Sequence, residues 1–199
     1  MSYSDFKSLD QINKELGLII KATSELYIDV EPVELSQWFI DTMKMAYIKA
    51  IRINTESSRQ ALIVDHVLME LNQHVNISFF LENAFNVDSN KGLTGNPDAI
   101  ISNSDNQLYI TSLVAVLVEA KKSDLGSGIA QCIAEMEAAR IFNEREANNI
   151  PIIYGVVTDG TLWQFLSLED NIATIDSYLY PFGNGGKIVG ILKSFFDGL

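Results

Sequence analysis

The sequence predicts an α/β protein in which helices pack on one mixed β-sheet. Apolar residues recur at helical spacing through most of residues 8–74, and from residue 76 onward the pattern changes to alternation and short apolar runs typical of strands. The 199 residues are 47% hydrophobic and 20% charged, which suits one folded domain with a sizeable core. No internal repeat or Pro/Gly-rich linker divides the chain.

Three helices are expected before the strands begin. The first covers residues 8–26 and ends at a proline-containing break, and the second covers residues 34–51. Asn54 or Thr55 is the expected N-cap of the third helix, which runs to about residue 74.

Five strands and two further helices are expected after residue 75. The strands are predicted at residues 76–87, 98–102, 108–120, 151–158 and 162–166, and the helices at residues 126–147 and 187–196. Turn-forming residues 104–106 join the second and third strands in a hairpin. Strand 151–158 is apolar on both faces, so we expect it in the centre of the sheet.

From residue 55 the predicted order is helix, three strands, helix, two strands (αβββαββ). We therefore assign residues 55–170 to a core. Residues 1–54 form an N-terminal helical extension and residues 171–199 a C-terminal helical extension, both packed on that core because no linker separates them.

Charge narrows the range of functions. With 26 acidic residues against 14 lysines and arginines, the net charge is −12, which argues against a protein that binds nucleic acid with its whole surface. Four basic residues nevertheless gather within residues 44–59, where Glu56 is the one acid. They are Lys44, Lys49, Arg52 and Arg59. This strip is either a solvated helix face or a local phosphate-binding surface.

The number of cysteines and the sequence of the N-terminus predict the cellular compartment of the protein. The single Cys132 excludes an intrachain disulfide and fits the reducing cytoplasm, and two histidines are too few for a multi-histidine metal centre. The N-terminus lacks the basic and apolar regions of a signal peptide, and no apolar run has membrane-spanning length. We expect a cytoplasmic protein with no membrane contact.

A motif at two neighbouring strands carries the chemistry. Asp98 opens one predicted strand in Asn-Pro-Asp, and the next strand ends in Val-Glu-Ala-Lys with Glu119 and Lys121. Side chains alternate along a strand, so Glu119 and Lys121 share a face, and pairing of the two strands brings Asp98 to the same place. Two carboxylates and an amine suit a divalent metal ion that activates water for phosphodiester hydrolysis. Without metal, at least one of the close carboxylates should have a raised pKa, whereas Lys121 should favour their ionised forms.

This motif and the element order resemble the PD-(D/E)XK nuclease superfamily, which has the restriction-endonuclease-like fold. The resemblance covers about residues 55–170. It implies that Asp98 and Glu119 ligate Mg²⁺ or Mn²⁺, that the carbonyl of Ala120 adds a backbone ligand, and that Lys121 orients the attacking water. The implied substrate is nucleic acid, with DNA expected.

Two further positions match parts of this superfamily. The segment Thr-Glu-Ser-Ser-Arg, with Glu56, resembles the first helix of the N-terminal nuclease domain of type I restriction motor subunits, which implies an outer metal ligand. The alternative is an acid favoured only by the helix dipole, and Glu70 and Glu82 are weaker candidates for the ligand. Gln131 resembles a glutamine that several branches place against the site, either as a catalytic group or simply as a polar helix residue. Those branches carry tyrosine four residues later, where this chain has Glu135.

Two functions follow from these patterns. The first is a magnesium-dependent, endonuclease-like hydrolase, which the three motif residues favour. The second is a non-catalytic protein-binding or regulatory protein on the same scaffold, which uses its acidic surface to contact protein partners. A homodimer is a separate expectation. The net charge of −12 and the missing tyrosine favour the second function.

Overall fold

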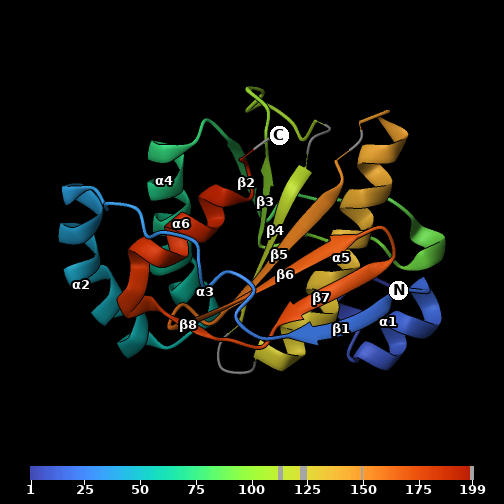
Figure 1. Ribbon diagram of the computed structural model, residues 1–199, viewed down its shortest axis with the longest axis horizontal. Helices are drawn as coiled ribbons and strands as arrows, with labels where there is room; N and C mark the ends of the chain where they lie inside the picture. Colours follow the sequence, from blue (N-terminus) through green and yellow to red (C-terminus); the bar gives the residue numbers. More distant parts are fainter. Residues whose placement is uncertain (112–113, 122–124, 149, 198–199) are drawn as a thin grey trace.

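The computed structural model describes residues 1–111, 114–121, 125–148 and 150–197. Eight strands within these residues form one sheet in the order β1-β7-β6-β5-β4-β3-β2, with β8 beside β6 (Figure 1). The strands are β1 (Ile19–Thr23), β2 (Ser78–Leu81), β3 (Ala99–Ser102), β4 (Val114–Ala120), β5 (Ile152–Thr158), β6 (Leu162–Glu169), β7 (Ile172–Asp176) and β8 (Tyr180–Pro181). The pairs β1–β7 and β4–β5 are parallel and the other pairs antiparallel, so the predicted mixed sheet is confirmed.

Helices cover both faces of this sheet (Figure 1). On one face lie α2 (Gln37–Ile53), α4 (Asp65–His74) and α6 (Gly185–Ser194), and on the other lie α1 (Leu9–Leu16) and α5 (Leu125–Arg145). Strand residues alternate between the two cores: Val116 and Val118 face the first set of helices, and Leu117 faces the second. Glu119 follows this alternation and shares the α5 face with Leu117.

The predicted order from residue 55 is observed. The third predicted helix consists of α3 (Glu56–Arg59), a π-helical segment (Gln60–Val64) and α4, and its N-cap is Thr55, whose side chain accepts a hydrogen bond from the Ser58 amide at 3.1 Å. Strands β2, β3 and β4, helix α5 and strands β5 and β6 follow. Strand β5 lies in the middle of the sheet, as its apolar residues predict.

The terminal segments are not purely helical, which corrects part of the prediction. The helix expected over residues 8–26 ends at Leu16, because Gly17 adopts a left-handed conformation with φ of 72° and ends the helix. Residues Ile19–Thr23 then form β1, which pairs with β7. The segment after residue 170 also supplies β7 and β8. Both ends of the chain therefore extend the central sheet.

Two predicted strands are shorter in the structure. Within the predicted strand 76–87 only β2 has strand conformation, and within the described part of the predicted strand 108–120, which lacks residues 112–113, only β4 does. Leu108 is 90% exposed, so the apolar letters that begin this second run do not belong to a buried strand. Among the described helices, none combines the length and apolar character needed to cross a lipid bilayer.

Candidate active site

Strand pairing places Asp98 next to Glu119, Ala120 and Lys121. In the antiparallel pair of β3 and β4, Ala99 lies opposite Val118, so Asp98 stands beside the end of β4. The amide of Ala120 donates a hydrogen bond to Oδ2 of Asp98 at 2.7 Å. The convergence expected from the motif is therefore observed.

The Lys121 ammonium group is the meeting point of the site. It forms an ion pair with Oε1 of Glu119, two residues earlier on the same strand face. It also lies 3.5 Å from Oε1 of Gln131 on α5 and 3.9 Å from Oε1 of Glu56 at the start of α3. One cation thus joins side chains from a strand and from two helices, and both secondary candidates, Glu56 and Gln131, lie at the site.

Glu135 is a site residue that the sequence motif did not identify. It lies one turn along α5 from Gln131, whose Nε2 donates to Oε1 of Glu135 at 3.1 Å. Glu135 is fully buried and lies close enough to Glu119 for the charge of Glu119 to disfavour its ionisation. An acid on a helix turn surrounded by apolar residues was the available signal, because such a group needs a polar partner.

The carboxyl groups of the site resist ionisation. The pKa of Glu119 is raised to about 7, first by burial and then by the charge of Asp98, while Lys121 opposes both effects. Burial also raises the pKa of Asp98, against the hydrogen bond from Ala120 and the charge of Lys121. The expected pKa increase is confirmed, although burial contributes more to it than repulsion does.

Glu135 and Lys121 complete this electrostatic pattern. Burial, and then the charge of Glu119, raises the pKa of Glu135 well above its ordinary value. Burial disfavours the charged form of Lys121, but its ion pair with Glu119 and the nearby Glu56 and Asp98 outweigh that cost, so the Lys121 pKa is raised. Lys121 therefore remains an ammonium group at neutral pH.

An acidic cleft of about 280 Å³ opens beside Asp98. Its lining includes Asp65, Glu82 and Gln60, which come from the helix after Thr55 and from the end of β2. Nε2 of Gln60 donates to Asp65 at 2.8 Å. Within the described residues, Oε1 of Gln60 has no hydrogen-bond partner. Glu82, a weaker candidate from the sequence, lies in this cleft and raises the pKa of Asp98.

Two other groups from the sequence analysis serve the fold instead. Glu70 is buried and accepts hydrogen bonds from the amide and hydroxyl of Ser36 at 2.7 and 2.6 Å, which ties the start of α2 to α4. Arg59 is also buried and donates to the carbonyl of Asp159 and, at 3.2 Å, to Oδ1 of Asn54. Its expected place in an exposed basic strip is therefore wrong.

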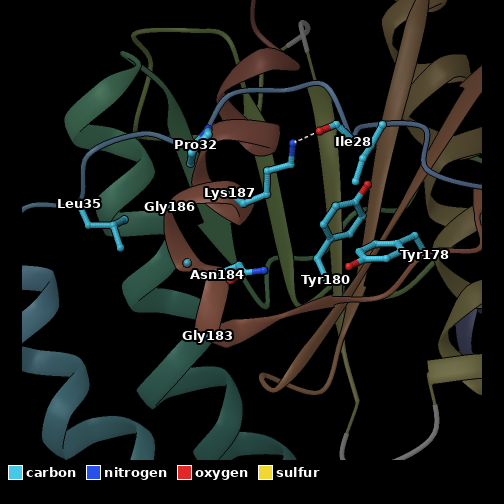
Figure 2. A pocket seen from close by; sticks show the side chains of 10 residues that line it. Ile28, Pro32, Leu35, Tyr178, Tyr180, Gly183, Asn184, Gly186 and Lys187 are labelled. Carbon is cyan, nitrogen blue, oxygen red and sulfur yellow. Dashed lines mark hydrogen bonds between the residues drawn. The ribbon is translucent and has the colours of Figure 1, made fainter.

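A second pocket, of about 410 Å³, lies between α6, β8 and the segment before α2 (Figure 2). It is mostly apolar, with the rings of Tyr178 and Tyr180 on one side and Pro32 on the other. The ammonium group of Lys187 donates a hydrogen bond to the carbonyl of Ile28 at 2.6 Å, which stabilises the backbone of the segment before α2. None of the predicted site residues lines this pocket.

The donors at the motif fit a hard divalent cation. Asp98 and Glu119 offer carboxylate oxygens, and Oε2 of Glu119 is buried without a hydrogen-bond partner in the described part of the chain. No group of three or more His, Cys, Asp or Glu side chains in that part is arranged as a metal site. A site here would rest on the two carboxylates, with the carbonyl of Ala120 as the predicted third ligand.

Neither a family model nor a curated protein matches this sequence.

Proposed function

We propose that the protein hydrolyses phosphodiester bonds of nucleic acid, with DNA as the expected substrate, at a PD-(D/E)XK-like site on a restriction-endonuclease-like core. The convergence of Asp98, Glu119 and Lys121 carries this proposal. Two observations add support: the order αβββαββ from residue 55, and the unpartnered, buried Oε2 of Glu119.

The proposed roles follow from the contacts of each side chain. Asp98 and Glu119 would hold Mg²⁺ or Mn²⁺, which when bound supplies Lewis-acid stabilisation and an acidified water. The amide of Ala120 orients Asp98, and Lys121 is held by Glu119 with its charge available to the phosphate. A fixed ammonium group at this point would offset negative charge that develops on the phosphate oxygens.

Gln131 and Glu56 would act by positioning. Gln131 lies between the Lys121 ammonium group and Glu135, so its amide links the strand side of the site to α5. Glu56 lies at the first turn of α3, where its exposed carboxylate can hold a water or an outer metal ligand.

The second candidate function is a non-catalytic protein-binding scaffold. The net charge of −12 favours it, because a strongly acidic body repels phosphates. Position 135 favours it as well, since the branches of the superfamily with the matching glutamine carry tyrosine there and this chain has Glu135. The two functions differ in one property that can be measured directly, which is metal-dependent cleavage.

The test is cleavage of single- and double-stranded DNA and RNA by purified protein with Mg²⁺ or Mn²⁺. Asp98→Asn, Glu119→Gln and Lys121→Met should each lower the cleavage rate by at least about a hundredfold, since each removes a ligand or a charge that acts in the transition state. Asp10→Asn, in an exposed ion pair with Lys14 on α1, is the matched control and should leave the rate unchanged. Protein that cleaves none of these substrates and binds neither ion would support the scaffold function instead.

A further inference from the structure

Helix α2 carries an exposed stripe on the side away from the core. Its buried residues, which include Phe39, Met43 and Ala50, face the other helices. At about 100° per residue, six exposed residues lie within roughly 60° of the direction of Met45, on the opposite side of the helix. They are Trp38, Asp41, Met45, Ile48, Lys49 and Arg52. We call this set the α2 stripe.

The apolar members of the α2 stripe are unusually exposed. Met45 is 62% exposed, Ile48 50% and Trp38 48%. Trp38 stacks on His66, with ring centroids 5.8 Å apart and planes 21° from parallel, so the indole is held in place before any partner arrives. A clustered apolar surface of this kind marks an interaction site. In Figure 1, α2 is the outermost helix on its side of the sheet.

The spacing of the α2 stripe fits a second helix. Trp38, Asp41, Met45, Ile48 and Arg52 follow one another by three, four, three and four positions, which is the repeat of a helix–helix seam. Side chains at this spacing can meet a partner helix along the whole length of α2.

The charges of the α2 stripe identify the partner as another copy of α2 in antiparallel orientation. If Met45 faces Met45 of a second copy, the residue four positions before it faces the residue four positions after it, so Asp41 meets Lys49. By the same symmetry Trp38 meets Arg52, which suits a cation–π contact. In a parallel pair each of these residues would face its own copy, and the like charges would repel.

We propose that the protein forms a twofold-symmetric homodimer through antiparallel pairing of its α2 stripes. Such an interface is self-complementary, with every contact made twice. Nucleic acid fits the α2 stripe less well, because Asp41 would face phosphate and Met45 would stay uncovered. Since Glu56 follows the C-terminal end of α2, the two candidate active sites of the dimer would lie at opposite ends of the helix pair.

The test is sedimentation equilibrium of the full chain over the micromolar to millimolar range. Met45→Asp should abolish the dimer. Asp41→Lys or Lys49→Asp alone should raise the dimer Kd by about tenfold or more, because each creates two like-charge contacts. The double variant Asp41→Lys/Lys49→Asp should restore the dimer, since it exchanges the charges. Leu108→Asp, at a position outside α2 that is even more exposed than Met45, is the control and should leave the Kd unchanged.

All of the altered side chains are exposed, so the variants should fold. Loss of the dimer can therefore be distinguished from loss of the folded structure. Circular dichroism and the melting temperature verify folding. A wild-type chain that stays monomeric overturns the proposal, whatever else α2 then binds. A dimer that persists in Met45→Asp, or a charge-exchanged double variant that stays monomeric, overturns it as well.

Discussion

Glu119 shows how a single residue links stability to chemistry. It is 1% exposed, at the end of a strand whose preceding residues are apolar, and the Lys121 ion pair offsets only part of the cost of burying its charge. Its pKa of about 7 means that the metal-free folded protein holds a proton which the unfolded chain releases near the ordinary value of 4.5. The candidate site thus keeps a poorly solvated carboxyl group at the expense of stability.

We predict that Glu119→Gln stabilises the metal-free protein at high pH. A group whose pKa is higher in the folded protein than in the unfolded chain stabilises the folded state at pH values below the unfolded-state pKa. For Glu119 this stabilisation is lost as the pH rises through about 7. The glutamine side chain cannot ionise, so the free energy of unfolding of the Glu119→Gln variant should exceed that of wild type by on the order of 2 kcal/mol at pH 8 and by little at pH 4. Thermal or urea unfolding at both pH values measures the difference, and Asp10→Asn is the exposed control. If the variant and wild type differed in stability equally at pH 4 and pH 8, the raised pKa of Glu119 would be contradicted.

The sequence identified the residues of the site better than it identified their surroundings. Asp98, Glu119 and Lys121 could be found because alternation along a strand and a hairpin connection determine which side chains meet. Glu135 could not be placed, because its role depends on α5 lying over the end of β4, a tertiary contact that local patterns do not encode. Arg59 was misplaced for the same reason, since its partner Asp159 is one hundred residues away in sequence.

At the scale of elements, close packing of α5 on the sheet sets the position of Lys121. Gly128 lies in the first turns of α5, and a Cβ atom there would come 2.7 Å from Cγ1 of Val157 and 3.0 Å from Cγ of Lys121. Val157 belongs to the central strand β5 and is buried, so it cannot yield readily. A glycine at this position allows the helix to approach the strand closely enough for Gln131 to reach Lys121.

We predict that Gly128→Ala lowers the free energy of unfolding by about 1–3 kcal/mol, the usual cost of adding volume to a packed interface. It should also displace Lys121, so any metal-dependent cleavage should fall more than metal affinity does. Chemical unfolding and calorimetric metal binding measure the two effects. Gly183→Ala is the control, because a Cβ at Gly183 has no atom within 4 Å. Unchanged stability in Gly128→Ala would show that the helix approach is not tight.

Elements with strong periodicity were predicted, and those defined by distant pairing were not. The third helix, β5 and α5 follow from apolar spacing because each buries one or both faces along its length. The sequence pattern predicts the end of a helix where β1 lies, since Ile19 and Ile20 also suit helical spacing. Its strand conformation depends on the left-handed Gly17 and on pairing with β7, about 150 residues later in the sequence.

At the scale of the whole molecule, the acidic body determines how ligands approach. A net charge of −12 attracts cations to the surface and repels nucleic acid, so any binding of DNA should be weak and sensitive to salt. Of the four residues in the predicted basic strip, Arg59 is buried and Lys44 forms an ion pair with Asp41 at 2.7 Å. The remaining Lys49 and Arg52 belong to the α2 stripe, so the four residues do not form the single basic surface that the sequence allowed.

We predict that Mg²⁺ and Mn²⁺ stabilise the protein more at pH 8 than at pH 5.5. A ligand that binds only the folded state stabilises that state by an amount set by the free ligand concentration and the Kd. Protons compete with the metal ion for the carboxylate oxygens of Asp98 and Glu119, so metal binding weakens as the pH falls. Because the pKa of Glu119 is about 7, lowering the pH to 5.5 should weaken metal affinity by roughly tenfold or more. Calorimetry at both pH values, at constant ionic strength, measures this change. The double variant Asp98→Asn/Glu119→Gln separates specific binding from the general attraction of cations to an acidic surface. Affinity that is equal at the two pH values, or unchanged in the double variant, would place the bound ion elsewhere on the molecule.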